Sequence, residues 1–135
     1  SIPVIENIFH ITYIRNEGAA FSMLQGHPML LIIFPAAVLG IGIIFILVKK
    51  NDFNRTFMGS LSLIVGGGLG NLTDRMAQGY VVDMFDLLLF SYPVFNLADC
   101  FVVVGAILGA VYYLWIYEKF DARKKSNDSP SDSHN

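Results

Sequence analysis

The sequence predicts a membrane α-helical fold, with three transmembrane helices and a small β-sheet at the membrane surface. Of its 135 residues, 54% are hydrophobic and only 15% are charged, which leaves too little charge to cover a soluble domain of this size. Three long stretches contain no charged residue, and segments rich in β-branched and aromatic residues lie outside them. The length allows a single domain, which we place at residues 1–120.

The three uncharged stretches are the expected membrane spans, at residues 28–48, 56–73 and 100–117. Each approaches the roughly 20 apolar residues that cross a bilayer as a helix. Glycines recur at four-residue intervals in the last two spans, as Gly66 and Gly70 and as Gly105 and Gly109. Such spacing suits close helix packing in lipid, so we interpret these glycines as packing positions.

Basic residues set the expected orientation. Lys49, Lys50 and Arg55 separate the first two spans, and four more basic residues between positions 119 and 125 follow the third. With three spans, both clusters fall on the same side of the membrane, which the positive-inside rule makes cytoplasmic. The N-terminal segment and the loop over residues 75–98 then face outward, and residues 121–135 are predicted to form a disordered cytoplasmic tail.

Two of the outward segments have extended character. Residues 5–14 predict a strand, which a turn at Asn16-Glu17-Gly18 follows. Residues 81–95 are also extended, with Pro93 near their end. Because irregular backbone is excluded from lipid, we expect these two segments to pair into a sheet at the membrane interface.

Acidic side chains beside the apolar spans are the main candidates for chemistry, since charge near the membrane is costly. Asp99 follows Asn96 at the spacing of a helix N-cap, so helix capping and catalysis are both open to it. The helix dipole at this position favours an ionised carboxylate. Asp83 follows Val81-Val82 with no adjacent cation, and this apolar setting is expected to raise its pKa.

Two further acids fit other roles. Asp74 precedes Arg75 and shares a helical face with Asn71, and we interpret it as an ion-paired brace. We interpret Asp86 as an interfacial residue that takes no part in catalysis.

Several other chemistries are disfavoured. Cys100 is the only cysteine, so an intramolecular disulfide is impossible, and a lone thiol without a base indicates a core position. The three histidines lack metal-ligand spacing, and the glycine-rich run at 66–70 lacks the lysine of a phosphate-binding loop. A net charge of −2 provides no broad basic field for nucleic acid.

Four segments of the chain resemble the lipoprotein signal peptidase family, in the family's order and spacing. They are Asn16–Phe21, Gly67–Arg75, Gly79–Asp83 and Pro93–Asp99. The resemblance extends over residues 5–117, and four motifs in register are far more specific than any one of them.

This resemblance implies an aspartic endopeptidase of the bacterial cytoplasmic (inner) membrane, with a catalytic dyad at Asp83 and Asp99. It implies site-shaping or substrate-binding roles for six further positions, Asn16, Asn71, Asp74, Arg75, Asn96 and Ala98. The family uses no metal or cofactor, and it cleaves prolipoproteins just before a diacylglyceryl cysteine. We therefore expect an extracytoplasmic active site, a sheet that cradles the substrate beside membrane lipid, a cytoplasmic C-terminus and a monomer.

The family has four spans, and we expect this chain to lack the first of them. Cys100 stands where the family commonly has serine, a nearly isosteric change. The mechanism we expect has ionised Asp99 taking a proton from water while protonated Asp83 supports the oxyanion, and the two roles can exchange. Two alternatives are a transporter or channel subunit with cation-binding carboxylates, and an assembly factor in which the acids only cap helices. Neither of them explains the four motifs.

Overall fold

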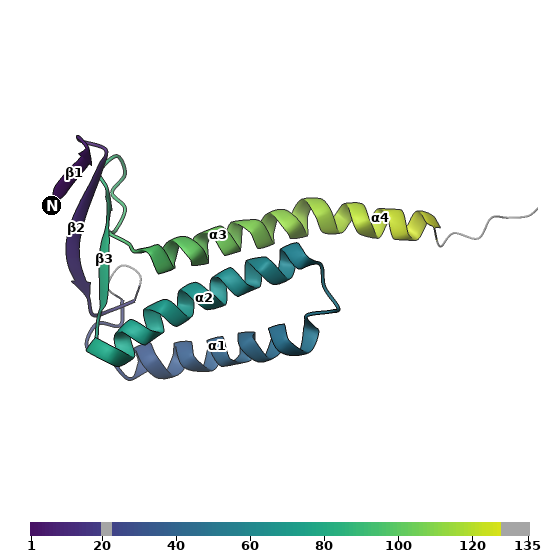
Figure 1. Cartoon of the computed structure of the whole chain (residues 1–135), viewed down its shortest axis with the longest axis horizontal. Helices are drawn as coiled ribbons and strands as arrows, with labels where there is room; N and C mark the ends of the chain where they lie inside the picture. The colour runs from purple at the N-terminus through teal and green to yellow at the C-terminus, as the bar shows by residue number, and fades with distance from the viewer. Residues whose placement is uncertain (20–22, 128–135) are drawn as a thin grey trace, which may run out of the picture.

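The structure, a computed structural model, describes residues 1–19 and 23–127. A three-stranded antiparallel sheet lies at one end of the molecule, and the helices run away from it (Figure 1). Helix α2 (Arg55–Gln78) packs against both α1 (Leu30–Lys49) and α3 (Leu97–Val111). Helix α3 continues through the π-helix η2 (Tyr112–Tyr117) into α4 (Glu118–Asn127), which extends beyond the other helices.

The N-terminal segment forms a hairpin of two strands, β1 (Ile2–Ile5) and β2 (Phe9–Asn16). The strand predicted over residues 5–14 is therefore confirmed from Phe9 onward, but it is wrong at residues 6–8, which form a turn. Asn7 adopts a φ of 59°, and the Ile8 N–H donates to the Ile5 carbonyl at 3.0 Å, which closes the turn between the strands. Asparagine tolerates this left-handed conformation better than most residues. A turn signal at residues 6–8 therefore interrupts the β-rich pattern.

Strand β3 (Val81–Leu87) pairs with β2 in antiparallel register, which confirms the predicted pairing of the two extended segments. The register sets Ile14 opposite Asp83 and Asn16 opposite Val81. The extended stretch is shorter than residues 81–95, because the chain turns after β3 and returns through a single bridge between Phe85 and Phe95. The sheet thus brings residues of the N-terminal hairpin and of the segment that follows α2 to the start of α3.

Capping residues determine where α2 ends and where α3 begins. Helix α2 ends where Gly79 adopts a φ of 84° and donates its N–H to the Arg75 carbonyl at 2.9 Å. Asp74 and Arg75 therefore lie in the last turns of the helix, and the outward loop predicted from residue 75 begins later. Helix α3 begins after Asn96, which forms a capping box with Asp99, as the sequence predicted.

Glycines let α2 and α3 approach closely. A side chain at Gly67 would collide with the Ala98 carbonyl oxygen, and one at Gly105 would lie 2.6 Å from the Ser60 carbonyl oxygen. Gly70 and Gly109 also lie at this interface, as their spacing predicted, whereas the space beside Gly66 is open. The prediction that Gly66 is a helix-packing position is thus wrong, because among the described residues no atom lies close to it and it is on the exposed side of α2.

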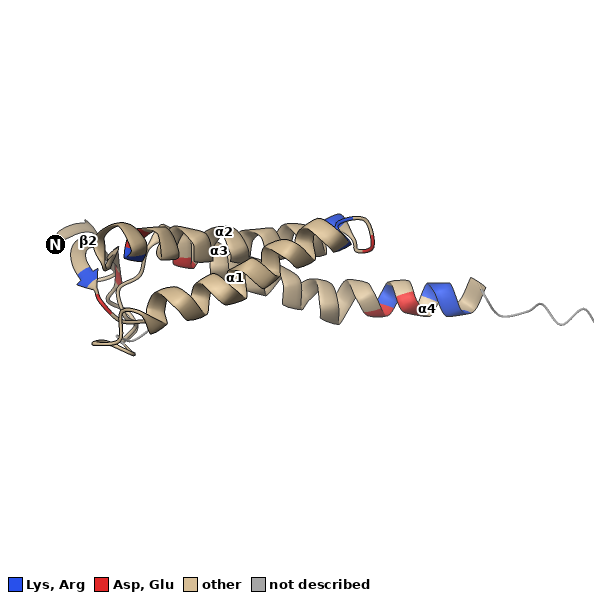
Figure 2. Ribbon diagram, turned by 90° about the horizontal axis from the view of Figure 1, so that it is seen from below, with Lys and Arg blue, Asp and Glu red and all other residues tan. Residues whose placement is uncertain are grey.

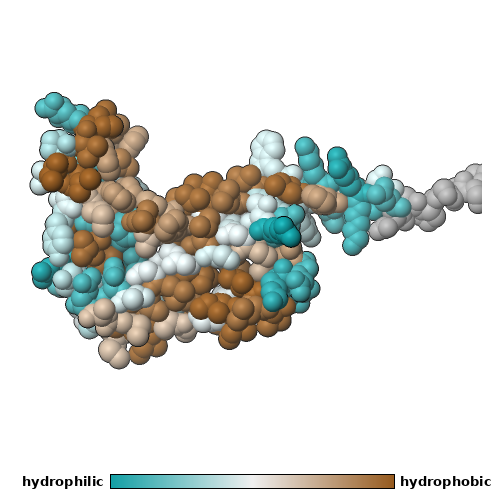
Figure 3. All heavy atoms as spheres, viewed as in Figure 1, coloured by the Kyte–Doolittle hydropathy of each residue, from teal (hydrophilic) through white to brown (hydrophobic). Residues whose placement is uncertain are grey.

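The helices are apolar on the outside, as the brown surface in Figure 3 shows. Within the described residues, helix α1 and the continuous helix Leu97–Asn127 are long and apolar enough to cross a membrane. Only 11% of the most apolar segment of the first helix and 6% of that of the second is buried inside the protein. Exposed side chains such as Phe34 and Ile41 need lipid around them. Helix α2 is not among these two helices, because glycines and polar residues lower its hydropathy.

The region after the third apolar stretch differs from the disordered tail predicted over residues 121–135. Residues up to Asn127 are helical, because α4 continues the turns of α3 and η2, and a salt bridge of 3.1 Å joins Lys125 to Asp121 one turn away. The rest of the predicted tail, residues 128–135, lies outside the described residues.

Candidate active site

A cavity of about 570 Å³ opens between the sheet, the end of α2 and the start of α3. Six of the eight site residues that the sequence predicted line it: Asn16, Asn71, Arg75, Asp83, Asn96 and Asp99. They come from four different elements, β2, α2, β3 and the α3 N-terminus. The fold therefore gathers residues that are far apart in the sequence around one space.

Asp83 is the third residue of β3, and its side chain is only 4% exposed. Val81 shares its face of the strand and is also buried, because side chains two apart in a strand point the same way. Each carboxylate oxygen of Asp83 accepts one hydrogen bond, Oδ1 from Asn96 Nδ2 at 2.9 Å and Oδ2 from Asn16 Nδ2 at 3.0 Å. Two asparagines thus hold the carboxyl group in one orientation.

Asp99 is held in a similar way by the first turn of α3. Its Oδ2 accepts the backbone N–H of Asn96 at 3.1 Å, and its Oδ1 accepts Asn71 Nδ2 at 2.8 Å. Asp99 therefore both caps the helix and lines the cavity. Helix capping and catalysis, the two roles that the sequence left open for it, do not exclude each other.

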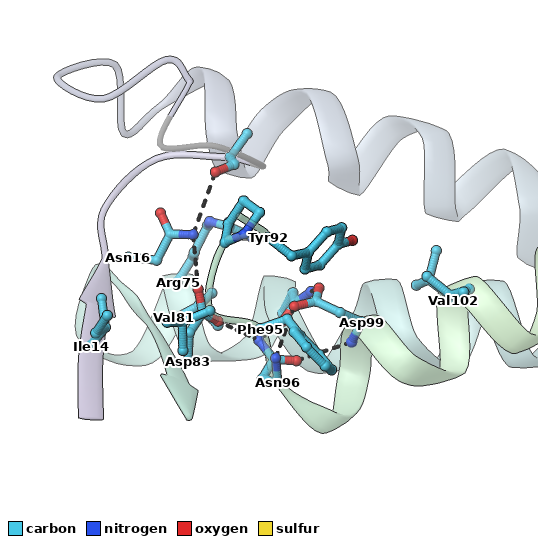
Figure 4. A pocket seen from close by; sticks show the side chains of 15 residues that line it. Ile14, Asn16, Arg75, Val81, Asp83, Tyr92, Phe95, Asn96, Asp99 and Val102 are labelled. Atoms are coloured by element: carbon cyan, nitrogen blue, oxygen red, sulfur yellow. Dashed lines mark hydrogen bonds between the residues drawn. The ribbon is translucent and has the colours of Figure 1, made fainter. Parts of the chain in front are cut away.

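Asn96 lies between the two aspartates and is 5% exposed (Figure 4). Its Nδ2 donates to Asp83 Oδ1 and to Asn71 Oδ1, the latter at 3.0 Å, and its Oδ1 accepts the Asp99 backbone N–H at 3.0 Å. Both hydrogens of the amide and its oxygen are thereby used. This single side chain fixes the placement of one aspartate relative to the other.

Asn16 and Arg75 tie the end of β2 to the cavity. Asn16 Oδ1 accepts the Gly18 N–H at 3.0 Å, which forms the turn predicted after β2. Arg75 Nη2 donates to the Gly18 carbonyl at 2.8 Å, a contact between segments 57 residues apart. The Nε atom of Arg75 is buried with no hydrogen-bond partner among the described residues.

The electrostatics of the cavity favour a proton on Asp83. Burial is the largest influence on this group and raises its pKa, and the neighbouring charge of Asp99 acts in the same direction. The hydrogen bonds from Asn16 and Asn96 and the charge of Arg75 oppose the shift, but the net direction is upward. Asp83 is therefore the aspartate suited to hold a proton at a pH where an exposed aspartate has lost it.

Two of the predicted site residues do not line the cavity. Ala98 instead packs on α2, where its carbonyl oxygen faces Gly67 and its Cβ faces Gly70. Asp74 is half-buried, and no salt bridge joins it to Arg75 within residues 1–19 and 23–127, because the Arg75 guanidinium reaches Gly18 instead. The brace interpretation of Asp74 is therefore wrong as far as the described contacts go.

The sequence predicted no site role for the residues that form the apolar wall of the cavity. It consists of Ile14, Ala19, Val81, Tyr92, Pro93, Val94, Phe95, Val102 and Val103. One signal was available, since Val102 and Val103 lie three and four residues after Asp99 and so share its side of the helix. No local pattern marks Tyr92, which is placed by the return of the chain toward Phe95, with the two rings 5.7 Å apart.

Comparisons with known proteins identify relatives of this chain. A family model described as signal peptidase (SPase) II matches residues 1–115. The lipoprotein signal peptidase of Halothermothrix orenii is 45% identical over 119 residues, which cover 88% of this chain and 79% of that protein. The corresponding protein of Clostridioides difficile is 41% identical over 120 residues, with 88% and 79% covered.

Solved structures show the same fold. One bacterial membrane enzyme superposes with a TM-score of 0.74 at 28% identity, covering all of this chain and 77% of the other. A second superposes with a TM-score of 0.74 at 33% identity, covering 85% and 75%. The helices and the small sheet therefore occur together in an enzyme of the membrane.

Proposed function

This chain belongs to the signal peptidase II family of membrane peptidases, and from that premise we propose that it removes the signal peptides of diacylglyceryl-modified prolipoproteins, cleaving just before the lipidated cysteine. The observation that carries the proposal is the joint presence of Asp83 and Asp99 in one cavity, linked through Asn96. A transporter subunit and a helix-capping assembly factor, the two alternatives from the sequence, do not account for membership of a peptidase family.

The proposed reaction uses Asp99 as the base and Asp83 as the acid. Asp99 takes a proton from a water molecule, and the resulting hydroxide attacks the carbonyl carbon of the scissile peptide. Protonated Asp83 donates a hydrogen bond to the oxyanion that forms, and the dyad then protonates the leaving amine. The raised pKa of Asp83 supports this division of roles.

The asparagines support the reaction by position. All four carboxylate oxygens accept an N–H, which leaves the second lone pair of each oxygen for water or substrate. Because Asn16, Asn71 and Asn96 are held by further contacts, the carboxyl groups need little reorganisation when the charge on the substrate develops. Arg75 supports the end of β2, where an extended substrate can lie along the cavity.

The apolar wall suits a substrate that carries lipid. Val102 and Val103 continue the cavity along α3, a helix whose outer side chains are apolar and exposed. A peptide whose cysteine bears acyl chains would keep these chains in the bilayer while its backbone reaches Asp99 at the helix end. The proposal thus places the scissile bond at the membrane surface.

The orientation follows the basic residues, most of which lie at the end of the molecule away from the cavity (Figure 2). We propose that α1, α2 and α3–η2 all span the bilayer of the bacterial inner membrane, with α2 packed between the other two. The sheet and the dyad would then face the extracytoplasmic side, and α4 the cytoplasm. A reporter enzyme that is active only in the cytoplasm, fused after Asn135, tests this arrangement, which predicts that the reporter is active.

The experiment that tests the substrate compares two forms of one prolipoprotein, with and without the diacylglyceryl group on its cysteine. The purified chain in detergent should release the signal peptide from the lipidated form and leave the unlipidated form uncut. Equal cleavage of both forms would contradict the proposed substrate class. Mass spectrometry of the released peptide checks that its last residue is the one before the cysteine.

A further inference from the structure

A second cavity, of about 840 Å³, lies at the opposite end of the helices from the dyad. It is lined by Asn54 at the start of α2 and by residues of η2 and α4, namely Tyr112, Tyr117, Phe120, Asp121, Arg123, Lys124 and Asn127. None of these residues takes part in the proposed hydrolysis. The cavity therefore calls for an explanation of its own.

The part of the lining nearest the other helices is aromatic, and Tyr112 packs against α2. Tyr112 and Tyr117 are the first and last residues of the π-helix, and Phe120 follows one turn later. The Tyr112 ring lies 5.7 Å from Phe57 of α2, which in turn lies 5.1 Å from Phe53 in the α1–α2 loop. Tyrosine rings concentrate where a protein passes from lipid to water, so the tyrosines of this lining suit a position at headgroup depth.

Further along the same helix, the lining carries two positive charges that no salt bridge offsets among the described residues. Within the described part of the chain, neither Arg123 nor Lys124 takes part in a salt bridge, and both are exposed. Asp121, the acidic residue that lines the cavity, is paired with Lys125 at 3.1 Å. The net character of this part of the lining is therefore cationic, and the basic residues around the α1–α2 connection lie at the same end of the molecule (Figure 2).

From these features we propose that the cavity binds the headgroup of an anionic phospholipid, with its phosphate at Arg123 and Lys124 and its glycerol region against Tyr112 and Tyr117. Cations that lie immediately beyond an apolar helix attract anionic lipid. The neighbouring N-terminus of α2, capped by Asn54, adds a partial positive charge on the opposite side. The exposed apolar surface of α3 and η2 continues from the cavity and can receive the acyl chains.

The chain contains a reporter for this site, because its single tryptophan, Trp115, lies within η2 and is 71% exposed. We would reconstitute the full chain in phosphatidylcholine nanodiscs and add brominated phosphatidylglycerol or brominated phosphatidylcholine at the same low mole fraction. Bromine quenches tryptophan at short range, so the proposal predicts stronger quenching by brominated phosphatidylglycerol. Equal quenching by the two lipids would overturn it.

Matched variants separate the cavity from general surface charge. The pair Arg123→Gln with Lys124→Gln should weaken the preference for phosphatidylglycerol by on the order of tenfold, because two charges near the headgroup are lost. The pair Lys49→Gln with Lys50→Gln removes the same charge at the same end from residues outside the cavity lining, and it should retain the preference. Equal losses in both pairs would contradict a cavity site.

Two further controls complete the test. The charge-retaining pair Arg123→Lys with Lys124→Arg should keep the preference, and its loss would contradict recognition by charge. Excess soluble glycerol phosphate should leave the stronger quenching by brominated phosphatidylglycerol unchanged. If glycerol phosphate abolished this difference between the two lipids, the cavity would be assigned to a free phosphate compound instead of a lipid. Signal-peptide cleavage should be unaffected in all of these variants, so the outcome is independent of the proposed peptidase mechanism.

Discussion

Asn96 donates a hydrogen bond to Asp83 at 2.9 Å while the oxygen of the same amide caps α3 by accepting the N–H of Asp99, in the first turn of that helix. The capping box that starts α3 and the link between the two aspartates are therefore one set of contacts. A shift of the helix start by one residue would move Asp99 and break the link to Asp83 together. The geometry of the dyad thus depends on the folding of the first turn of α3.

Substitutions of Asn96 should separate its two roles. Asn96→Ser keeps an oxygen that can cap the helix, but it has no N–H₂ group to reach Asp83 and Asn71. Asn96→Ala removes both functions and should cost about 1 kcal/mol more in stability, the usual value of an N-cap. We expect both variants to lose cleavage activity, with Asn96→Ser the more stable in thermal unfolding. An active Asn96→Ser variant would show that the link to Asp83 is dispensable.

The pH dependence of cleavage should respond to Asn16. Its hydrogen bond favours the ionised form of Asp83 and so lowers the pKa of that group, although burial keeps the pKa raised overall. Asn16→Ala should therefore raise the pKa further, and the protonated acid would persist to higher pH. We expect the alkaline limb of kcat/KM to move to higher pH in this variant. Asn54→Ala removes an asparagine far from the dyad and should leave the limb in place.

The close approach of α2 and α3 can be tested at two neighbouring glycines. A Cβ at Gly67 would lie 2.8 Å from Val102 Cγ2 and would also collide with the Ala98 carbonyl, whereas the space beside Gly66 is open. Gly67→Ala should destabilise the protein by about 1–3 kcal/mol and reduce cleavage, because it pushes Asn71 away from Asp99. Gly66→Ala should be neutral or slightly stabilising in the same unfolding measurement. Equal effects of the two changes would contradict the described interface.

The proposed reaction requires no metal. Treatment with a strong chelator, followed by removal of the chelator and its complexes, should leave the cleavage rate of the parent chain unchanged. A rate that falls and then recovers on addition of one divalent metal would contradict a mechanism carried by two aspartates alone.

Local signals predicted much of the site. The spacing of Asn96 and Asp99 predicted the capping box, and the apolar neighbours of Asp83 predicted its burial and the direction of its pKa shift. Both features depend on residues within a few positions of each other, which a sequence displays directly. The turn at Asn16 is of the same kind.

Long-range contacts were beyond such reasoning. The bond from Arg75 to Gly18 depends on the register of β2 against β3 and on the direction in which α2 ends, so the adjacent Asp74 was the obvious but wrong partner. The hairpin at Asn7 was missed because β-branched residues on both sides concealed a short turn. The helical continuation past residue 121 was missed because a polar composition alone does not reveal that a preceding helix supports it.

The central claim is that Asp83 and Asp99 together hydrolyse the peptide bond. The most direct measurement is the cleavage of a diacylglyceryl-modified prolipoprotein by the parent chain and by the variants Asp83→Asn and Asp99→Asn, in detergent and with the folded state checked by thermal unfolding. The account predicts that each variant folds and loses more than about 10²-fold in rate, because each lacks one half of the acid–base pair. Substantial cleavage by either folded variant would contradict the assignment of the dyad.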